Sequence, residues 1–195
     1  MGPERVKALE KRFNDLVMEW NSKINLVSRK KSNIYDLIED SRLFLGCIEF
    51  MEGLEVLDLG TGGGLPGVVI KIHHPEVNIT LVDSIKKKSD ALRDIVFKLG
   101  LEGTDVVNSR AEELGKHPNF KRRYDYIVAR SVSTLDILAK WSKNLIKPGG
   151  KLITIKGVDI SEEVLRAKRY KYVKNIEMFE KDGKNVLTVH FVEKY

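Results

Sequence analysis

Apolar residues near the start of the chain recur three or four positions apart. They are Val6, Leu9, Phe13, Leu16 and Trp20, and this spacing places them on one stripe of a helix. A polar stretch follows at residues 21–32, and a second amphipathic segment then carries Ile34, Leu37, Ile38, Phe44 and Leu45. Because about 50 residues bury little core on their own, the pattern predicts that residues 1–50 form a helical cap on the rest of the chain.

From residue 51 onward, short β-rich runs alternate with helical stretches. The predicted strands cover residues 55–59, 78–82, 105–108, 125–129 and 152–156. The predicted helices between them cover residues 66–73, 86–99 and 134–145, and Lys147-Pro148-Gly149-Gly150 is expected to end the last of these and turn the chain. Strands separated by helices indicate an α/β fold with a parallel, doubly wound sheet.

The last part of the chain breaks this alternation. After residues 160–169, strand-like runs at 172–179 and 186–192 flank Lys181-Asp182-Gly183-Lys184. Asp-Gly between such runs is a strong hairpin signal. We therefore predict a mostly parallel seven-stranded sheet with a terminal antiparallel hairpin. A chain of 195 residues fits one domain (1–195), made of the cap (1–50) and an α/β core (51–195), because domains usually have about 100–200 residues.

Composition narrows the class of protein. The net charge is +6, spread along the chain in short clusters, which fits either a polyanionic partner such as RNA or ordinary solvated faces. No apolar run approaches the length of a membrane helix, and the N-terminus lacks a secretion signal. The single cysteine, Cys47, excludes an internal disulfide or a multi-cysteine zinc site. We expect a soluble, cytoplasmic protein without a metal.

A glycine-rich loop carries the strongest chemical signal. The run Val56-Leu57-Asp58-Leu59-Gly60-Thr61-Gly62-Gly63-Gly64-Leu65-Pro66-Gly67 follows the first predicted strand and opens a helix, which is the setting of a nucleotide-binding loop. Residues 62–67 also match the dinucleotide pattern G-x-G-x-x-G, so a nicotinamide-dependent reductase is one alternative. A purely structural glycine turn is another.

Asp58 separates the possible ligands. A carboxylate just before the loop would repel a pyrophosphate, whereas S-adenosylmethionine has no phosphate and carries an ammonium group that the carboxylate could attract. Asp83 closes the second predicted strand, where an acid can accept hydrogen bonds from ribose hydroxyls. The terminal hairpin would add an antiparallel strand to the sheet, and this resembles the seventh strand of the methyltransferase fold. The sequence thus favours a Rossmann-like S-adenosylmethionine-dependent methyltransferase fold.

Further motifs follow the loop in a specific order. They are Val82-Asp83-Ser84, Ser109-Arg110-Ala111-Glu112-Glu113 and Ala129-Arg130-Ser131-Val132, with Asn21, Asn25-Leu26-Val27-Ser28 and Asp40-Ser41 in the cap. Over about the whole chain, they resemble the small-subunit ribosomal RNA (guanine-N7) methyltransferases, the glucose-inhibited division protein B family. The resemblance implies methyl transfer from S-adenosylmethionine to N7 of a guanine in the 530 loop of 16S ribosomal RNA. The implied partner is this RNA or the small ribosomal subunit, and we expect a monomer.

Site residues follow from position and resemblance together. We expect the loop to line the methionine and sulfonium side of the cofactor through Gly60, Thr61, Gly62, Gly64 and Leu65. Asp83 and Ser84 should border the ribose, and Ala111 and Glu112 the adenine. The candidate catalytic residues are Arg130, Arg110 and Lys156, near strand ends where open α/β sheets bind ligands. Arg130 should also contact the cofactor; the alternative is an ion pair with Asp58 or Asp83.

Guanine N7 has a free lone pair, so the reaction needs positioning and exclusion of water more than a general base. No Asn-Pro-Pro-Tyr or Asp-Pro-Pro-Tyr motif for amino-group methylation is present. Cys47 precedes the glycine loop, the wrong place for the nucleophile of a pyrimidine-C5 enzyme. Two rival functions remain: a small-molecule methyltransferase, and a non-catalytic RNA-binding module on the same fold.

Two further expectations concern the helices and the polar stretch of the cap. Trp20 and Trp141 lie on helical stripes and are expected in the core. The stretch that contains Asn21, Asn25, Ser28 and the triplet Arg29-Lys30-Lys31 is expected either to form an RNA-facing rim or to be a capped loop between helices.

Overall fold

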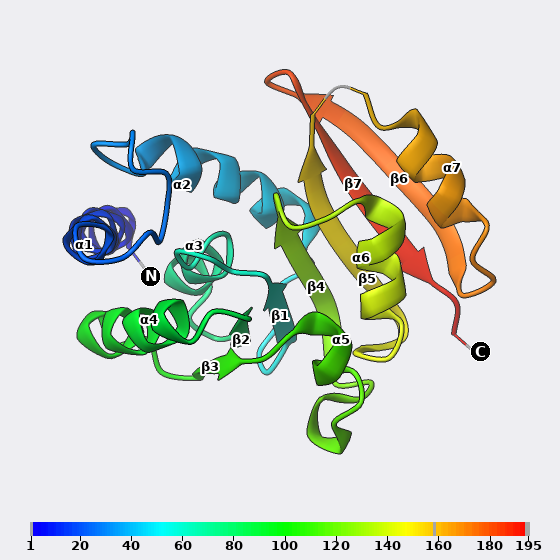
Figure 1. Cartoon of the computed structure of the whole chain (residues 1–195), viewed down its shortest axis with the longest axis horizontal. Helices are drawn as coiled ribbons and strands as arrows, with labels where there is room; N and C mark the ends of the chain where they lie inside the picture. Colours follow the sequence, from blue (N-terminus) through cyan, green and yellow to red (C-terminus); the bar gives the residue numbers. More distant parts are fainter. Residues whose placement is uncertain (1, 158, 194–195) are drawn as a thin grey trace.

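The computed structural model describes residues 2–157 and 159–193. Its seven strands form one sheet in the order β3-β2-β1-β4-β5-β7-β6, as Figure 1 shows. The strands are β1 (Glu55–Leu59), β2 (Asn78–Asp83), β3 (Thr104–Asn108), β4 (Tyr124–Arg130), β5 (Ile146–Lys156), β6 (Val173–Lys181) and β7 (Lys184–Phe191). The first five pair in parallel, and β7 runs antiparallel to both β5 and β6. The predicted fold class is confirmed.

The helices cover both faces of this sheet (Figure 1). They are α1 (Pro3–Asn21), α2 (Tyr35–Arg42), α3 (Gly67–His73), α4 (Lys86–Leu99), α5 (Ala111–Leu114), α6 (Leu135–Ser142) and α7 (Ser161–Lys168), with short 3-10 helices η1 (Leu43–Cys47) and η2 (Pro118–Phe120). The four-residue α5 follows β3 and was not predicted. None of the helices in these two described segments could cross a lipid bilayer.

Two apolar clusters form the core, one on each face of the sheet. The first joins the cap to α3, α4 and the inner strands, because Phe13, Ile38 and Phe44 of the cap pack with Val56 and Ile70. The second lies under α6 and α7. The apolar side chains of residues 1–50 thus share a core with the α/β part of the chain, which explains why the first fifty residues need no core of their own.

The structure differs from the prediction between α6 and β5. The helix expected over residues 134–145 ends at Ser142, and Lys147-Pro148-Gly149-Gly150, expected to be a turn before the strand, lies inside β5. Tyr124 pairs with Ile146, but Tyr126 pairs with Lys151, so the residues between them bulge out of register. Gly149 has φ +77, a value that a glycine reaches without steric cost.

Candidate active site

A hollow opens at the carboxyl ends of β1, β2 and β3, beside the point where the sheet order reverses between β1 and β4. Its volume is about 190 Å³, and it is lined by Leu59, Gly60, Val82, Asp83, Ser84, Ser109, Arg110, Ala111, Glu112, Val132 and Trp141. Ligands of open α/β sheets bind at this kind of topological switch point. The fold therefore places a binding site where the glycine loop, the end of β2 and the start of α5 meet.

The hollow brings together part of the expected site. Among the described residues, its lining includes the expected cofactor contacts Gly60, Asp83, Ser84, Ala111 and Glu112, together with Arg110. It does not include Thr61, Gly62, Gly64, Leu65, Arg130 or Lys156. The adenosine half of the expected site thus lies around this hollow, and the other residues lie beside it.

The glycines of the loop serve different neighbours. Gly60 has φ +76, and a Cβ there would lie 2.7 Å from Cγ2 of Val132. Gly64 has φ +94 and faces the core, where a Cβ would lie 2.8 Å from Val68. Gly62 has φ +56, with only the Leu26 carbonyl near its missing Cβ, at 3.9 Å. Of these three glycines, Gly60 is the one whose Cβ would meet a residue that lines the hollow.

Asp58 lies buried beneath the loop. Its Oδ2 accepts hydrogen bonds from the Thr61 hydroxyl at 2.6 Å and from the Gly67 amide at 2.8 Å. Its Oδ1 is buried, with no hydrogen-bond partner in the described part of the chain. Burial raises the pKa of Asp58 to about 6, because a low-dielectric surrounding disfavours the charged form. The carboxylate thus shapes the loop and keeps one acceptor unused.

Asp83 braces the loop from β2. Its Oδ2 accepts from the Gly62 amide at 3.0 Å and its Oδ1 from the Ile85 amide at 2.8 Å. The Val82 carbonyl accepts from the amides of Gly60 and Thr61, both at 2.9 Å. The acid expected to meet the ribose therefore also fixes the backbone of the glycine loop.

Residues 21–27 of the cap pack over the glycine loop. The Asn21 side-chain oxygen accepts from the Leu26 and Val27 amides, at 2.9 and 3.0 Å, and so folds residues 21–27 into a turn. This turn lies on the loop, because a Cβ at Gly63 would be 3.1 Å from Cγ1 of Val27. This turn is part of the stretch that was expected to be either an RNA-facing rim or a capped loop between helices, and in the basic triplet of that stretch Lys31 pairs with Asp36.

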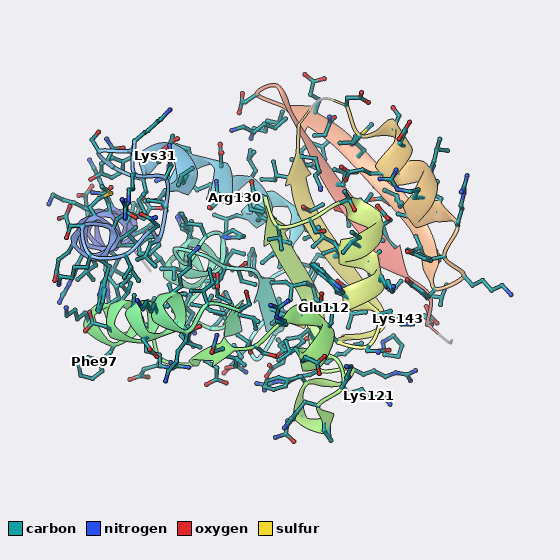
Figure 2. All side chains as sticks on the ribbon, viewed as in Figure 1. Lys31, Phe97, Glu112, Lys121, Arg130 and Lys143 are labelled. Atoms are coloured by element: carbon teal, nitrogen blue, oxygen red, sulfur yellow. The ribbon has the colours of Figure 1, made fainter. Side chains whose placement is uncertain are left out.

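Arg130 ends β4 beside α2, apart from Glu112 on α5 (Figure 2). Its side chain is 16% exposed, and its Nη1 lies 3.7 Å from Oδ2 of Asp40. Its Nε is buried with no hydrogen-bond partner in residues 2–157 and 159–193. The expected alternative partners, Asp58 and Asp83, were wrong as ion-pair partners: α2 of the cap supplies the carboxylate.

Lys156 ends β5, the strand next to Arg130. Its Nζ lies 3.0 Å from Oε2 of Glu163 and donates to the Ser133 carbonyl. Oε2 of Glu163 also accepts from the Leu135 amide at 2.8 Å, at the start of α6. Lys156 thus braces the segment between β4 and α6, which carries Val132.

Sequence reasoning missed two walls of the hollow. Trp141, expected in the core, is only partly buried and lines the hollow from α6. Trp141 does lie on the apolar side of its helix, but the spacing of apolar residues does not show which of them lies at the edge of the core. Val132 belongs to the quoted Ala-Arg-Ser-Val motif, and that motif is the signal that could have found it. Trp20 is also partly buried and donates to Asp94 at 2.7 Å.

Several known proteins with similar sequences carry the same name. The family model "rRNA small subunit methyltransferase G" (GidB) matches residues 7–188. Ribosomal RNA small subunit methyltransferase G of Desulforamulus reducens is 37% identical over 94% of this chain and 73% of its own length. The proteins of that name from Clostridium novyi and Lactococcus lactis are 34% and 31% identical, over 80% and 87% of this chain and 65% and 72% of their own lengths.

Solved structures with low sequence identity share the fold. A SAM-dependent O-methyltransferase from Thermotoga maritima matches with a TM-score of 0.63 at 15% identity, over 79% of this chain and 65% of that chain. TrmN from Thermus thermophilus matches with a TM-score of 0.64 at 17% identity, over 94% of this chain and 53% of that chain. The resemblance stated from the motifs is confirmed by the family model. The chain belongs to the GidB family, rRNA small subunit methyltransferase G.

Proposed function

We propose that this chain transfers a methyl group from S-adenosylmethionine to N7 of a guanine in the 530 loop of 16S ribosomal RNA. We further propose that it acts as a monomer in the cytoplasm, on the RNA or on the small ribosomal subunit. The relatives' names support ribosomal RNA of the small subunit as substrate. The observation that carries the proposal is the hollow at the topological switch point, lined by the glycine loop, the end of β2 and the start of α5.

The residues present fit S-adenosylmethionine. Gly60 brings the backbone of the loop to the wall of the hollow, so close to Val132 that a Cβ would lie 2.7 Å from its Cγ2. The buried Oδ1 of Asp58 has no partner in the described part of the chain and suits a nearby ammonium group. Asp83 and Glu112 supply carboxylates along the hollow, suited to ribose hydroxyls and to an adenine amino group. When bound, this cofactor would supply an electrophilic methyl group on a sulfonium.

The chain's own residues then have to position the acceptor, because the N7 lone pair attacks without losing a proton first. Arg130 is the strongest candidate for this work. A planar guanidinium donates well to guanine O6 or to a phosphate, and its Nε carries no other bond among the described residues. Arg110 lines the hollow at the start of α5 and is exposed there, so we propose it for the RNA backbone. Lys156 acts by bracing the wall that holds Val132.

The experiment combines purified protein with labelled S-adenosylmethionine and small ribosomal subunits from cells that lack this modification, and then maps the modified nucleotide. We expect one methyl group per subunit, on N7 of one guanine in the 530 loop. Arg130→Ala should leave the protein folded and lower kcat/KM about 100-fold, or about 2.7 kcal/mol of transition-state stabilisation. Lys181→Ala, on the exposed hairpin, is the control and should keep full activity.

Other outcomes would overturn the proposal in distinct ways. Methylation of a small molecule but not of RNA would favour the small-molecule enzyme. Binding of RNA without any transfer, with a steep salt dependence from phosphate contacts, would favour a non-catalytic module. A folded Arg130→Ala variant with full activity would remove Arg130 from the site.

A further inference from the structure

Asp40 lies between two cations that come from distant parts of the chain. Its Oδ2 is 3.7 Å from Nη1 of Arg130, and its Oδ1 accepts a hydrogen bond from Nζ of Lys184. Asp40 belongs to α2 of the cap, Arg130 ends β4, and Lys184 begins β7 of the terminal hairpin. One carboxylate therefore joins the cap, the end of the central strand and the hairpin.

The contact with Arg130 is loose. A separation of 3.7 Å exceeds the usual 2.7–3.2 Å of a hydrogen bond, so the pair is held by charge alone. The guanidinium is nevertheless largely buried, and its Nε has no partner in the described part of the chain. Burial lowers the pKa of Arg130 from its ordinary value, while the charges of Asp40 and Asp58 act to raise it. Arg130 is thus held near Asp40 with donors still uncommitted.

Lys184 competes with Arg130 for the same carboxylate. Arginine and a carboxylate normally form two parallel hydrogen bonds when both oxygens are available. Here Lys184 donates to Oδ1 and so holds the carboxylate, while Oδ2 stays 3.7 Å from Nη1 of Arg130. Asp36, the other carboxylate of α2 that acts on Arg130, is paired with Lys31. In the described chain, no other carboxylate lies nearer to Arg130 than that of Asp40.

We propose that Asp40 is a positioning residue whose carboxylate is divided between Lys184 and Arg130, so that the donors of Arg130 stay available to the RNA substrate. This inference rests on the proposed function, in which Arg130 contacts the guanine or its phosphate. Without Lys184, Asp40 turns both oxygens to Arg130 and binds the guanidinium to the cap. In this way a residue of the terminal hairpin tunes the reacting site.

The test uses a double-mutant cycle. Lys184→Met should lower kcat/KM on small ribosomal subunits about tenfold, mainly through KM, and leave the Kd for S-adenosylmethionine unchanged. In an Asp40→Asn background the same substitution should have no further effect, because the competing carboxylate is gone. Lys181→Met is the matched control: it lies opposite Lys184 in the hairpin register and is exposed, so it should behave as wild type.

A second measurement does not need the proposed reaction. Nitrogen-15 NMR of the Arg130 Nε–H, assigned with Arg130→Lys, should show a shifted signal in Lys184→Met and an unshifted one in Lys181→Met. Equal behaviour of the two lysine variants, or additive losses in the cycle, would overturn the inference. If the wild-type protein fails to methylate RNA while the NMR shift is seen, the proposed function is wrong. The inference that the Asp40 carboxylate is divided between Lys184 and Arg130 is then still supported.

Discussion

Val132 packs directly against Gly60 in the lining of the hollow, so closely that a Cβ on Gly60 would lie 2.7 Å from Cγ2 of Val132. Val132 follows β4 and Gly60 follows β1, and these strands are neighbours in the sheet. The glycine is therefore required twice, by its φ of +76 and by the contact with Val132. The width of the hollow at this point is set by a pair of residues from two motifs.

Gly60→Ala tests this relationship. The added methyl group has to displace Val132 into the hollow, so we expect at least a tenfold loss of S-adenosylmethionine affinity by calorimetry. The positive φ should also cost about 1 kcal/mol of unfolding free energy. Gly53→Ala is the matched control, because Gly53 has φ +75 with nothing within 4 Å. It should lose similar stability and no affinity; equal affinity losses would contradict the assignment.

Trp141 gives an optical test of the cofactor site. The chain has two tryptophans, and only Trp141 lines the hollow. S-adenosylmethionine should therefore quench the fluorescence of wild type and of Trp20→Phe, but not of Trp141→Phe. Trp141→Ala should weaken binding about tenfold, since an aromatic contact contributes about 0.5–1.5 kcal/mol. Quenching that persists in Trp141→Phe would place the cofactor elsewhere.

Asp58 should make stability depend on pH. Its pKa is about 6 in the folded chain against an ordinary 3.8, so the folded state holds the proton more tightly than the unfolded state. The resulting stabilisation is complete below pH 3.8 and is lost as pH rises through 6, by on the order of 3 kcal/mol.

The measurement is the difference in unfolding free energy between Asp58→Asn and wild type. Asparagine can keep both hydrogen bonds through its oxygen and has no charge to bury. This difference should therefore shift in favour of the variant between about pH 4 and 6 and stay level above pH 7. A difference that does not change with pH would show that Asp58 titrates normally.

A partly buried ion pair joins α1 and α2 of the cap, and His73 of α3 contacts the same carboxylate. Glu10 is 6% exposed and accepts from Nη2 of Arg42 at 2.5 Å, and His73 lies 2.9 Å from its other oxygen. Burial acts to raise the pKa of Glu10, but the bonds from Arg42 and His73 outweigh it and lower the pKa. Arg42→Met leaves a buried carboxylate short of its main partner.

We therefore expect Arg42→Met to lower the unfolding free energy at pH 7 by about 2 kcal/mol, less than the 3–5 kcal/mol of fully buried pairs, because Arg42 is partly exposed. Arg93→Met serves as the control, since the Arg93–Asp90 pair is about half exposed. That variant should change stability by less than about 1 kcal/mol. If urea denaturation gave equal losses of unfolding free energy for Arg42→Met and Arg93→Met, the Glu10–Arg42 pair would contribute no more than an exposed pair.

The strands and most helices could be predicted because their signals are local. Apolar runs marked the strands, and Asp182-Gly183 marked the hairpin between β6 and β7. The bulge at residues 147–150 could not be read, because a Pro-Gly-Gly sequence suits a turn as well as an irregular strand. The four-residue α5 is too short to show a periodic pattern.

The site could be predicted in part for a similar reason. Asp83 ends a strand, Gly60 and Glu112 follow strands, and parallel strands bring their carboxyl ends to one edge of a sheet. The partner of Arg130 could not be predicted, because Asp40 comes from a cap whose packing depends on tertiary contacts. The contact of Val27 with Gly63 could not be predicted either, because no local pattern shows where a polar loop will pack.

The link between Asp40 and Lys184 joins residues 144 positions apart. During synthesis, α2 is made early, but Asp40 can pair with Lys184 only after almost the whole described chain has been added. Contacts of such long range form late in folding, because the chain must first pay the entropy of closing the loop. The protein can thus build its glycine loop and hollow first, and acquire the arrangement around Arg130 only when the hairpin docks.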